Sequence, residues 1–455
     1  MSFKELKRSE FISTLMARRS HRPATLGVGQ LTLVEHALCP LDARRSAVSS
    51  LVHEATFRFS DKARRRQTGN VRVLCPLGLS PKDEFFLWGL LAMTIADPEC
   101  DGELHATRHY CLRRLGMIDA KVRRGGRQYS DFTAAIERLA CVRYQCDKFY
   151  DPIRAEHRRV AFGFFSYSLP LDDDSSRAWR FVWDPIFFKF VRAAGGSLRF
   201  NLEIYRQLDV AGRRLYLFLT KLFFRQSVTS RLDLNEVAEQ ILGVASSVSL
   251  RDKKARLLRC VNQLSDLDVI ERGDITRVGK GKFAMVFHRG SAFRRPVTES
   301  AFESPLHESL LSIGFDVAGA DRILRRFKHP LVREWVDITL AARERFGPHF
   351  FKRGAPAFLT DNLKHATAGS RTPPDWWSEL RREEQRASAE RAKGVHAAYS
   401  GIGIEQLAPN AADAVNDVYG SIFAQFLAAG QPEDVARENA RRFDAAREQL
   451  AKRKP

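Results

Sequence analysis

The stretch "GGRQYSDFTAAIERLACVRYQ", residues 125–145, joins a basic, glycine-rich entrance to one short helix and the start of a strand. Ser130 is a residue type that caps helices, and from Phe132 onward apolar residues recur at the spacing of one helical face. A polar loop, "DPIRAEHRR", then leads into the apolar run "VAFGFFSYSLPL". A helix followed by a basic-tipped hairpin is typical of a winged helix-turn-helix, whose helix enters the DNA major groove. An ordinary helix and hairpin of any α+β domain would show the same pattern.

The same order of elements recurs further along the chain. The predicted helices "LSPKDEFFLWGLLAMTIAD" and "ATRHYCLRRLGM" precede the quoted one. A second set comprises "DVAGRRLYLFLTKLFFRQ", "LNEVAEQILGV" and "SVSLRDKKARLLRCVNQLSDLDVI", followed by the strand "RVGKGKFAMVFHRG". Five apolar pairs share an offset of 125 residues: Leu90 with Leu215, Met93 with Phe218, Phe132 with Leu257, Ile136 with Val261, and Leu139 with Leu264. Two similar units in tandem are the simplest account, although generic amphipathic helices can also align by chance.

The third helix of the second set is strongly basic on one side. Its leucines and valine are expected to face inward: Leu250, Leu257, Leu258, Val261 and Leu264. The whole chain carries a formal charge of +20, and such an excess favours a polyanionic partner, because Lys and Arg release counterions from phosphates. Arg outnumbers Lys, so an arginine-rich host proteome would raise the charge as well. One-sided placement of cations on a helix and wing is therefore the stronger indication of DNA binding.

These patterns yield a set of candidate DNA contacts. In the first unit the residues expected at base edges are Gln128, Tyr129 and Thr133, and those expected on the phosphate backbone are Arg123, Arg124, Arg127 and Arg138. In the second unit the candidates are Arg251, Lys253, Lys254, Arg256 and Arg259 on the third helix, with Arg277, Lys280 and Lys282 on the wing. Glycines at the wing tip let the backbone approach a phosphate.

Signatures of catalysis are missing from the sequence. A Walker A loop, a G-x-S-x-G elbow and an H-E-x-x-H helix are all absent. The pair His105 and His109 and the run 172–174 of three aspartates are more typical of a helix surface and a solvated turn than of metal ligands. Seven scattered cysteines without a C-x-x-C motif indicate reduced thiols. We expect a cytoplasmic protein that is not an enzyme, holds no cofactor or metal, and does not enter a membrane.

The predicted fold class is α+β and helix-rich, with two tandem winged-helix domains followed by a helical C-terminal module. The expected boundaries are a basic, partly flexible arm over 1–70, a first winged-helix domain over 71–171, a second with a β-rich linker over 172–295, a helical module over 300–378, and a charged, partly flexible helical tail over 379–455.

With these units placed, the chain resembles the plasmid replication initiators built from tandem winged-helix domains, the replication initiator protein A type. The resemblance rests on "FTAAIERLACVRYQ" in the first unit and on "FNLEIYRQLDVAGRRLYLFLTKLFFRQ" and "LRDKKARLLRCVNQLSDLDVI" in the second. A third segment, from "HESLLSIGF" to "TPPDWW", is similar to a helical tail of many initiators. The resemblance implies double-stranded DNA with origin repeats as partner, recruitment of host replication proteins, and for some members a homodimer through the first unit. A winged-helix transcriptional regulator and a winged-helix protein–protein module stay open as alternatives.

Overall fold

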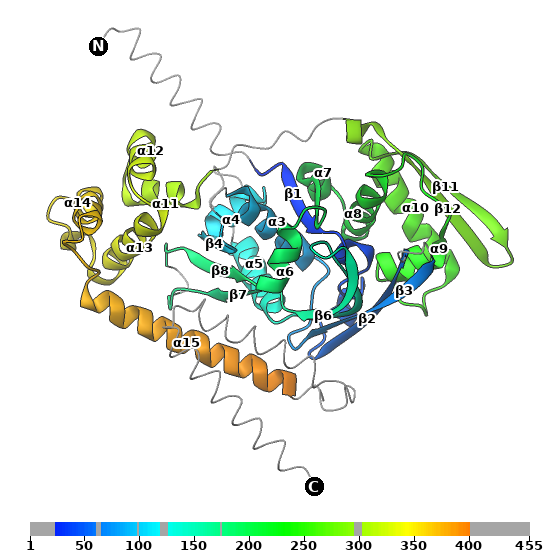
Figure 1. The fold of residues 1–455 in the computed structure, drawn as a ribbon, viewed down its shortest axis with the longest axis horizontal. Helices are drawn as coiled ribbons and strands as arrows, with labels where there is room; N and C mark the ends of the chain where they lie inside the picture. The colour runs from blue at the N-terminus through cyan, green and yellow to red at the C-terminus, as the bar shows by residue number, and fades with distance from the viewer. Residues whose placement is uncertain are drawn as a thin grey trace, which may run out of the picture.

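The structure is a computed structural model that describes residues 23–60, 65–97, 100–118, 126–172, 175–294 and 303–400. It is a mixed α+β fold in which the described strands form four small antiparallel sheets. The helices of the C-terminal module occupy one end of the long axis, and a projecting hairpin occupies the other (Figure 1). None of the described helices is long and apolar enough to cross a membrane.

The first repeated unit contains three helices and a three-stranded sheet. Its elements are α3 (Asp83–Ala96), β4 (Glu103–Ala106), α4 (Arg108–Arg114), α5 (Gly126–Ala140), β7 (Phe165–Ser168) and β8 (Trp179–Trp183). The strands lie in the order β4-β8-β7, so the first strand pairs with the last. The α3 helix begins at Asp83, about three residues later than the start near Ser80 that the sequence pattern indicated. The expected contact between the two residues is present, because the Asp83 carboxylate accepts a hydrogen bond from the Ser80 backbone N–H at 2.8 Å.

The quoted helix α5 begins earlier than the sequence pattern indicated. It starts at Gly126, so that Ser130 lies inside the helix and does not cap it. An ion pair between Arg127 and Asp131, one turn apart at 3.8 Å, supports this extra turn. The inner face is as expected, with Phe132 and Ile136 fully buried.

The second repeated unit has the same element order and the same strand order. Its elements are α8 (Val210–Phe223), β10 (Leu232–Asp233), α9 (Leu234–Glu236) continuing into a π-helical turn (Val237–Ile241), α10 (Leu250–Asp266), β11 (Ile270–Gly279) and β12 (Lys282–Arg289). The strands lie in the order β10-β12-β11. The sequence repeat therefore corresponds to a structural repeat: helix, strand, two helices and two strands, with the first strand beside the third in both sheets.

The hairpin that follows α5 belongs to a different sheet. It consists of β5 (Arg143–Asp151) and β6 (Glu156–Phe162), and β5 pairs with β3 (Arg66–Cys75), which pairs with β2 (Leu51–Ser60). We expected this hairpin to be a free wing. It is instead half of a four-stranded sheet. The strands of the first unit that occupy the same sheet positions as β11 and β12 of the second unit are β7 and β8.

The N-terminal segment is packed into the core, in contrast to the flexible arm expected over 1–70. Its strand β1 (Leu26–Gln30) pairs with β9 (Ser197–Asn201), and its short helices are Leu33–Glu35 and α2 (Ala43–Ser46). Val28 and Leu38 are buried, because the apolar residues of this segment complete the core around α3 and α8. Residues 1–22 of the expected arm lie outside the described residues.

The segment between the two units alternates strands and helices. After β8 come α6 (Pro185–Arg192), β9 and α7 (Leu202–Gln207). Asp184 caps α6 and Asn201 caps α7, each by accepting backbone N–H groups of the first turn. The aromatic residues of this segment, among them Phe187 and Phe200, are buried in the core shared by both units, as expected for core rather than a surface for bases.

The C-terminal module has a hydrophobic core of its own. It is built from α11 (Pro305–Ile313), α12 (Val317–Arg326), α13 (His329–Phe346), a 3-10 helix (Pro348–Phe350) and α14 (Ala355–Thr367). Trp335 and Leu363 lie at its centre. The long helix α15 (Asp375–Ser400) then runs back along the first unit (Figure 1). The rest of the expected tail, from residue 401, lies outside the described residues.

Candidate nucleic-acid interface

The third helix of the second unit, α10, presents a basic face. Ser249 caps the start of the helix: its hydroxyl accepts from the Asp252 N–H at 3.1 Å and donates to the Asp252 carboxylate at 2.7 Å. The inner face buries Leu257 and Leu264. The remaining candidate cations are exposed or half-buried: Arg251, Lys254, Arg256 and Arg259.

The hairpin β11–β12 extends this basic face. Arg277, Lys280 and Lys282 are exposed at its tip, where Gly281 adopts a left-handed φ of 69°. The Lys254 ammonium of α10 lies 4.8 Å from the centre of the Phe283 ring of β12, and this contact joins helix and hairpin. Figure 1 shows the hairpin projecting beyond α10 at the end of the molecule.

This surface is positive because its cations lack carboxylate partners in the part of the chain that the structure describes. Within the described residues no ion pair engages the cations of α10 and the hairpin tip, namely Arg251, Lys254, Arg256, Arg259, Arg277, Lys280 and Lys282. The nearest acid on the helix, Asp252, accepts a hydrogen bond from the Ser249 hydroxyl. An unneutralised row of Lys and Arg on a helix and an adjacent hairpin is the charge pattern that phosphates bind.

Lys253 must be removed from the predicted contacts. Its side chain is 5% exposed, and its ammonium donates to Glu239 at 2.7 Å and to the Ser246 carbonyl at 3.0 Å. The reason is helical phase: Lys253 lies one turn before Leu257 and therefore on the inner face of α10. Its charge ties α10 to the preceding helix and loop.

The sequence pattern also misplaced an apolar residue of this surface. Leu258, which we expected to face inward, is 40% exposed. It lies one turn after Lys254, on the outer face of α10, and careful helical phasing from Leu257 would have placed it there. Val278, near the hairpin tip, is 55% exposed. The basic surface therefore contains two accessible apolar side chains.

In the first unit, part of the predicted surface is accessible. The Arg127 side chain is 88% exposed near Asp131. Gln128 is half-buried. The Tyr129 hydroxyl lies 2.7 Å from His109 Nδ1, so this ring is tied to α4. Among the described residues at this end of α5, Arg127 therefore has an acid beside it, unlike the candidate cations of α10.

Two other candidates of the first unit are structural. The guanidinium of Arg138 donates to both carboxylate oxygens of Asp83, at 2.7 and 2.8 Å, and anchors α5 to the start of α3. The Thr133 hydroxyl is buried, has no hydrogen-bond partner among the described residues, and cannot reach a base edge. Both predictions are wrong, because each side chain points into the fold. Arg123 and Arg124 lie outside the described residues.

The loop between β7 and β8 of the first unit is covered by the C-terminal module. Arg177 forms an ion pair with Glu384 of α15 at 2.7 Å, and both side chains are buried. Its guanidinium also lies 5.0 Å from the centre of the Trp377 ring. On the same loop, the Ser175 hydroxyl donates to Glu344 of α13 at 2.8 Å. In the first unit, β7–β8 is the strand pair that corresponds to the basic hairpin β11–β12 of the second unit. The loop of β7–β8 thus contacts the C-terminal module, whereas the tip of β11–β12 is exposed.

The polar side chains offer little for metal or nucleophilic chemistry. Among the described residues no group of three or more His, Cys, Asp or Glu side chains is placed to hold a metal ion. His105 instead contacts Glu103 at 2.9 Å. None of the seven cysteines, all of which lie in the described residues, forms a disulfide, and burial raises the pKa of Cys75 and Cys260 to about 12, so these two thiols stay protonated at neutral pH.

Comparison with known proteins shows only distant likeness. No family model and no curated protein matches this sequence. Among solved structures, the chain is similar to domain 2 and domain 3 of RctB, with 14% sequence identity and a TM-score of 0.36. The match covers 55% of this chain and 94% of the RctB chain. The resemblance to plasmid replication initiators stays a prediction.

Proposed function

We propose that the protein binds double-stranded DNA through α10 and the β11–β12 hairpin, and that both repeated units are winged-helix domains. The observation that carries the proposal is the joint surface of α10 and the hairpin, whose exposed cations lack carboxylate partners among the described residues. The order of helices and strands, repeated in both units with the first strand beside the third, supports the winged-helix interpretation.

In this arrangement α10 enters the major groove and the hairpin follows the phosphate backbone. Arg251 and Arg256 are the candidates for guanine, and a bidentate Arg–guanine contact contributes about 1–3 kcal/mol of discrimination. Leu258 offers an apolar contact for a thymine methyl group. Lys280 and Lys282 hold phosphates, and the open backbone at Gly281 allows close approach.

We propose further that this binding serves replication. The resemblance to plasmid replication initiators supports recognition of repeated sites at an origin, with host replication proteins as further partners and a homodimer through the first unit. A transcriptional regulator of the same fold would use the same surface. The loop of the first unit, docked through Arg177 and Glu384, favours a protein-contact role for that unit.

The test is fluorescence anisotropy of the purified chain with DNA from upstream of its own gene and with a shuffled duplex, at several salt concentrations. We expect a preference on the order of a thousandfold for the first duplex at physiological salt. Equal binding to both duplexes, lost as salt rises, would contradict specific recognition, because bulk charge alone behaves in that way.

Variants locate the surface. Arg256→Ala should weaken binding to the preferred duplex or relax its base preference, and Lys280→Ala should lower the salt slope by about one. Arg325→Ala, an exposed cation on α12, is the matched control and should leave both quantities unchanged. Unchanged binding by Arg256→Ala and Lys280→Ala would remove α10 and the hairpin from the proposal.

A further inference from the structure

The outer end of the C-terminal module carries two exposed, stacked phenylalanine rings. Phe346 ends α13, and Phe350 ends the 3-10 helix that follows. Their ring centres are 5.1 Å apart with an interplanar angle of 19°. Phe346 is 42% exposed and Phe350 is 38% exposed. The pair therefore presents ring surface to solvent.

Other aromatic side chains fix the position of this pair. The Trp376 ring packs edge-on against Phe346 at 5.3 Å, and the Phe358 ring packs edge-on against Phe350 at 5.6 Å. Gly347, between the two phenylalanines, has a φ of 74°, a left-handed conformation that ends α13 and turns the chain. The exposed rings are thus held by packed neighbours and not by contact with each other alone.

The same short segment is basic. Arg345, His349, Lys352 and Arg353 are exposed, and the Arg345 guanidinium lies 5.6 Å from the centre of the Phe346 ring. The acid next in sequence, Glu344, is turned toward the first unit, where its carboxylate accepts hydrogen bonds from Ser175 and Ser176. Asp375, at the start of α15, is the acid on the neighbouring helix. Residues 344–353 thus contain three Arg and Lys charges and one carboxylate, which already accepts hydrogen bonds from the two serines.

We propose that this surface binds single-stranded nucleic acid. Exposed aromatic rings interleaved with cations bind single strands, because every unpaired base has a π face that can stack and every nucleotide has a phosphate. In a duplex the base faces are covered by neighbouring base pairs, so ring stacking selects unpaired strands. Phe346 and Phe350 stack with bases, and Arg345, Lys352 and Arg353 hold the phosphates.

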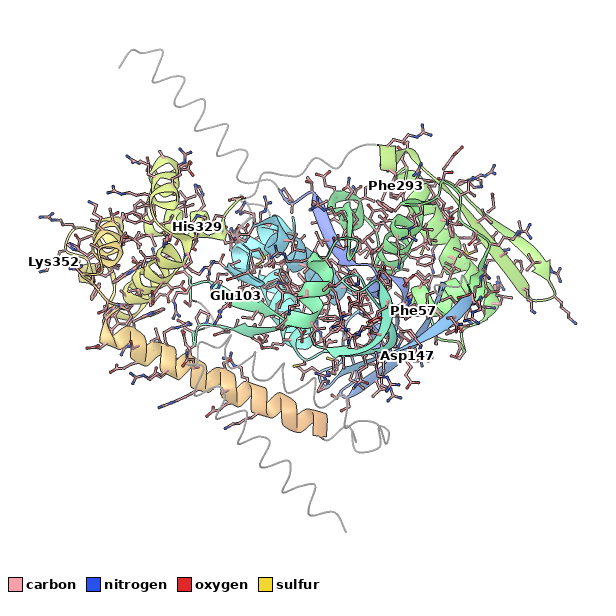
Figure 2. The ribbon with its side chains drawn as sticks, in the orientation of Figure 1. Phe57, Glu103, Asp147, Phe293, His329 and Lys352 are labelled. Carbon is pink, nitrogen blue, oxygen red and sulfur yellow. The ribbon has the colours of Figure 1, made fainter. Side chains whose placement is uncertain are left out.

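This surface is separate from the proposed duplex interface. Figure 2 places Lys352 at the outer end of the C-terminal module, opposite the end where the β11–β12 hairpin projects. The hydrophobic core of the module is also distinct from the core of the two repeated units. Variants at one surface should therefore leave the other intact, and the two proposals can fail independently.

The experiment measures binding of the full chain to labelled oligothymidine of about 20 nucleotides, longer than a typical single-strand site. A matched oligomer keeps every phosphate and replaces the bases by abasic residues. We expect the oligothymidine to bind at least roughly tenfold more tightly, because stacking on even one ring contributes that much. Equal affinity for the two oligomers would overturn the proposal and would leave an acidic protein surface as the partner that fits the charge.

Variants assign the effect to the two rings. The double substitution Phe346→Leu and Phe350→Leu keeps apolar side chains in the aromatic cluster but removes the stacking faces, so it should abolish the preference for oligothymidine. The matched control is Phe224→Leu, which alters a phenylalanine that is 86% exposed in the second unit. A preference that survives the double substitution, or that is lost equally in the control, would contradict the proposal. Arg256→Ala should leave the preference for oligothymidine over the abasic oligomer unchanged, even where it weakens binding of both oligomers, because it removes a charge and not a ring; this separates the stacking surface from α10.

Discussion

The guanidinium of Arg214 and the carboxylate of Glu84 form a buried ion pair that joins the two repeated units, with Nη2 and Oε1 2.5 Å apart. Glu84 lies at the start of α3 in the first unit, and Arg214 lies in the first half of α8 in the second. Arg214 also donates to the Leu242 carbonyl at 2.7 Å. Because both side chains are below 10% exposed, the pair fixes the relative position of the two units.

Removing one member of this pair should destabilise the whole two-unit body. We expect Glu84→Gln to lower the free energy of unfolding by about 3–5 kcal/mol, because Arg214 would remain buried without a counter-charge. Urea unfolding measures this loss. The control is Glu54→Gln, which breaks an exposed ion pair with Arg72 and should cost less than about 1 kcal/mol. Equal losses in the two variants would mean that Arg214 finds another partner.

Arg138 should behave as a structural residue and not as a DNA contact. Arg138→Ala leaves the Asp83 side chain, which is 2% exposed, without its partner. We expect the free energy of unfolding to fall by about 3 kcal/mol, while the folded variant binds duplex DNA with unchanged affinity. The double variant Arg138→Met with Asp83→Asn removes both charges and should recover part of the loss. Weaker DNA binding by the folded single variant would return Arg138 to the interface.

His36 should make the fold sensitive to acid. Its Nε2 lies 2.9 Å from the Tyr144 hydroxyl, and burial lowers its pKa to about 3. Between pH 6.5 and 3, His36 is therefore protonated in the unfolded chain, where its pKa is near 6.5, and neutral in the folded chain. The contribution of His36 to the free energy of unfolding is fully present above pH 6.5 and is lost as the pH falls toward 3.

The measurement is urea unfolding between pH 7.5 and 4.5, compared for the wild type and His36→Gln. The loss due to His36 over this range is about 2–3 kcal/mol, so the variant should show a shallower decline. The carboxylates contribute equally to both proteins and cancel in the difference. His365→Gln, at an exposed position, should retain the full decline. An identical decline in the wild type and His36→Gln would show that His36 is not the acid-sensitive group.

The ion pair between Arg177 and Glu384 should hold α15 against the first unit. Glu384→Gln leaves the Arg177 charge buried, so we expect faster amide hydrogen exchange in β8 and in the first turns of α15. Glu383→Gln changes the exposed neighbouring residue and should leave exchange unchanged. Binding to duplex DNA should be the same in both variants, because the proposed interface lies in the second unit. Unaltered exchange in Glu384→Gln would mean that other contacts hold α15.

Local patterns in the amino-acid sequence located the helices and most of their buried residues, although they misplaced the start of α5 and the side chain of Leu258. Phe132 and Ile136 in α5, and Leu257 and Leu264 in α10, are buried as their 3.6-residue spacing indicates. The repeat was also visible, because the same apolar spacing recurs at a constant offset. These features depend on residues within one or two helical turns of each other, and such short-range relationships can be read directly from the chain.

The accessibility of each cation, in contrast, depended on contacts between distant parts of the chain. Helical phase relative to Leu257 marks Lys253 as an inner residue, but the spacing of residues does not reveal that Arg138 is bound by Asp83 or that Lys253 is bound by Glu239. Likewise, the hairpin after α5 became part of a sheet because β3, far earlier in the chain, pairs with β5. A side chain's charge is available to DNA only when no carboxylate lies within a few ångströms of it. That proximity arises from packing in three dimensions, so the spacing of residues along the chain does not reveal it.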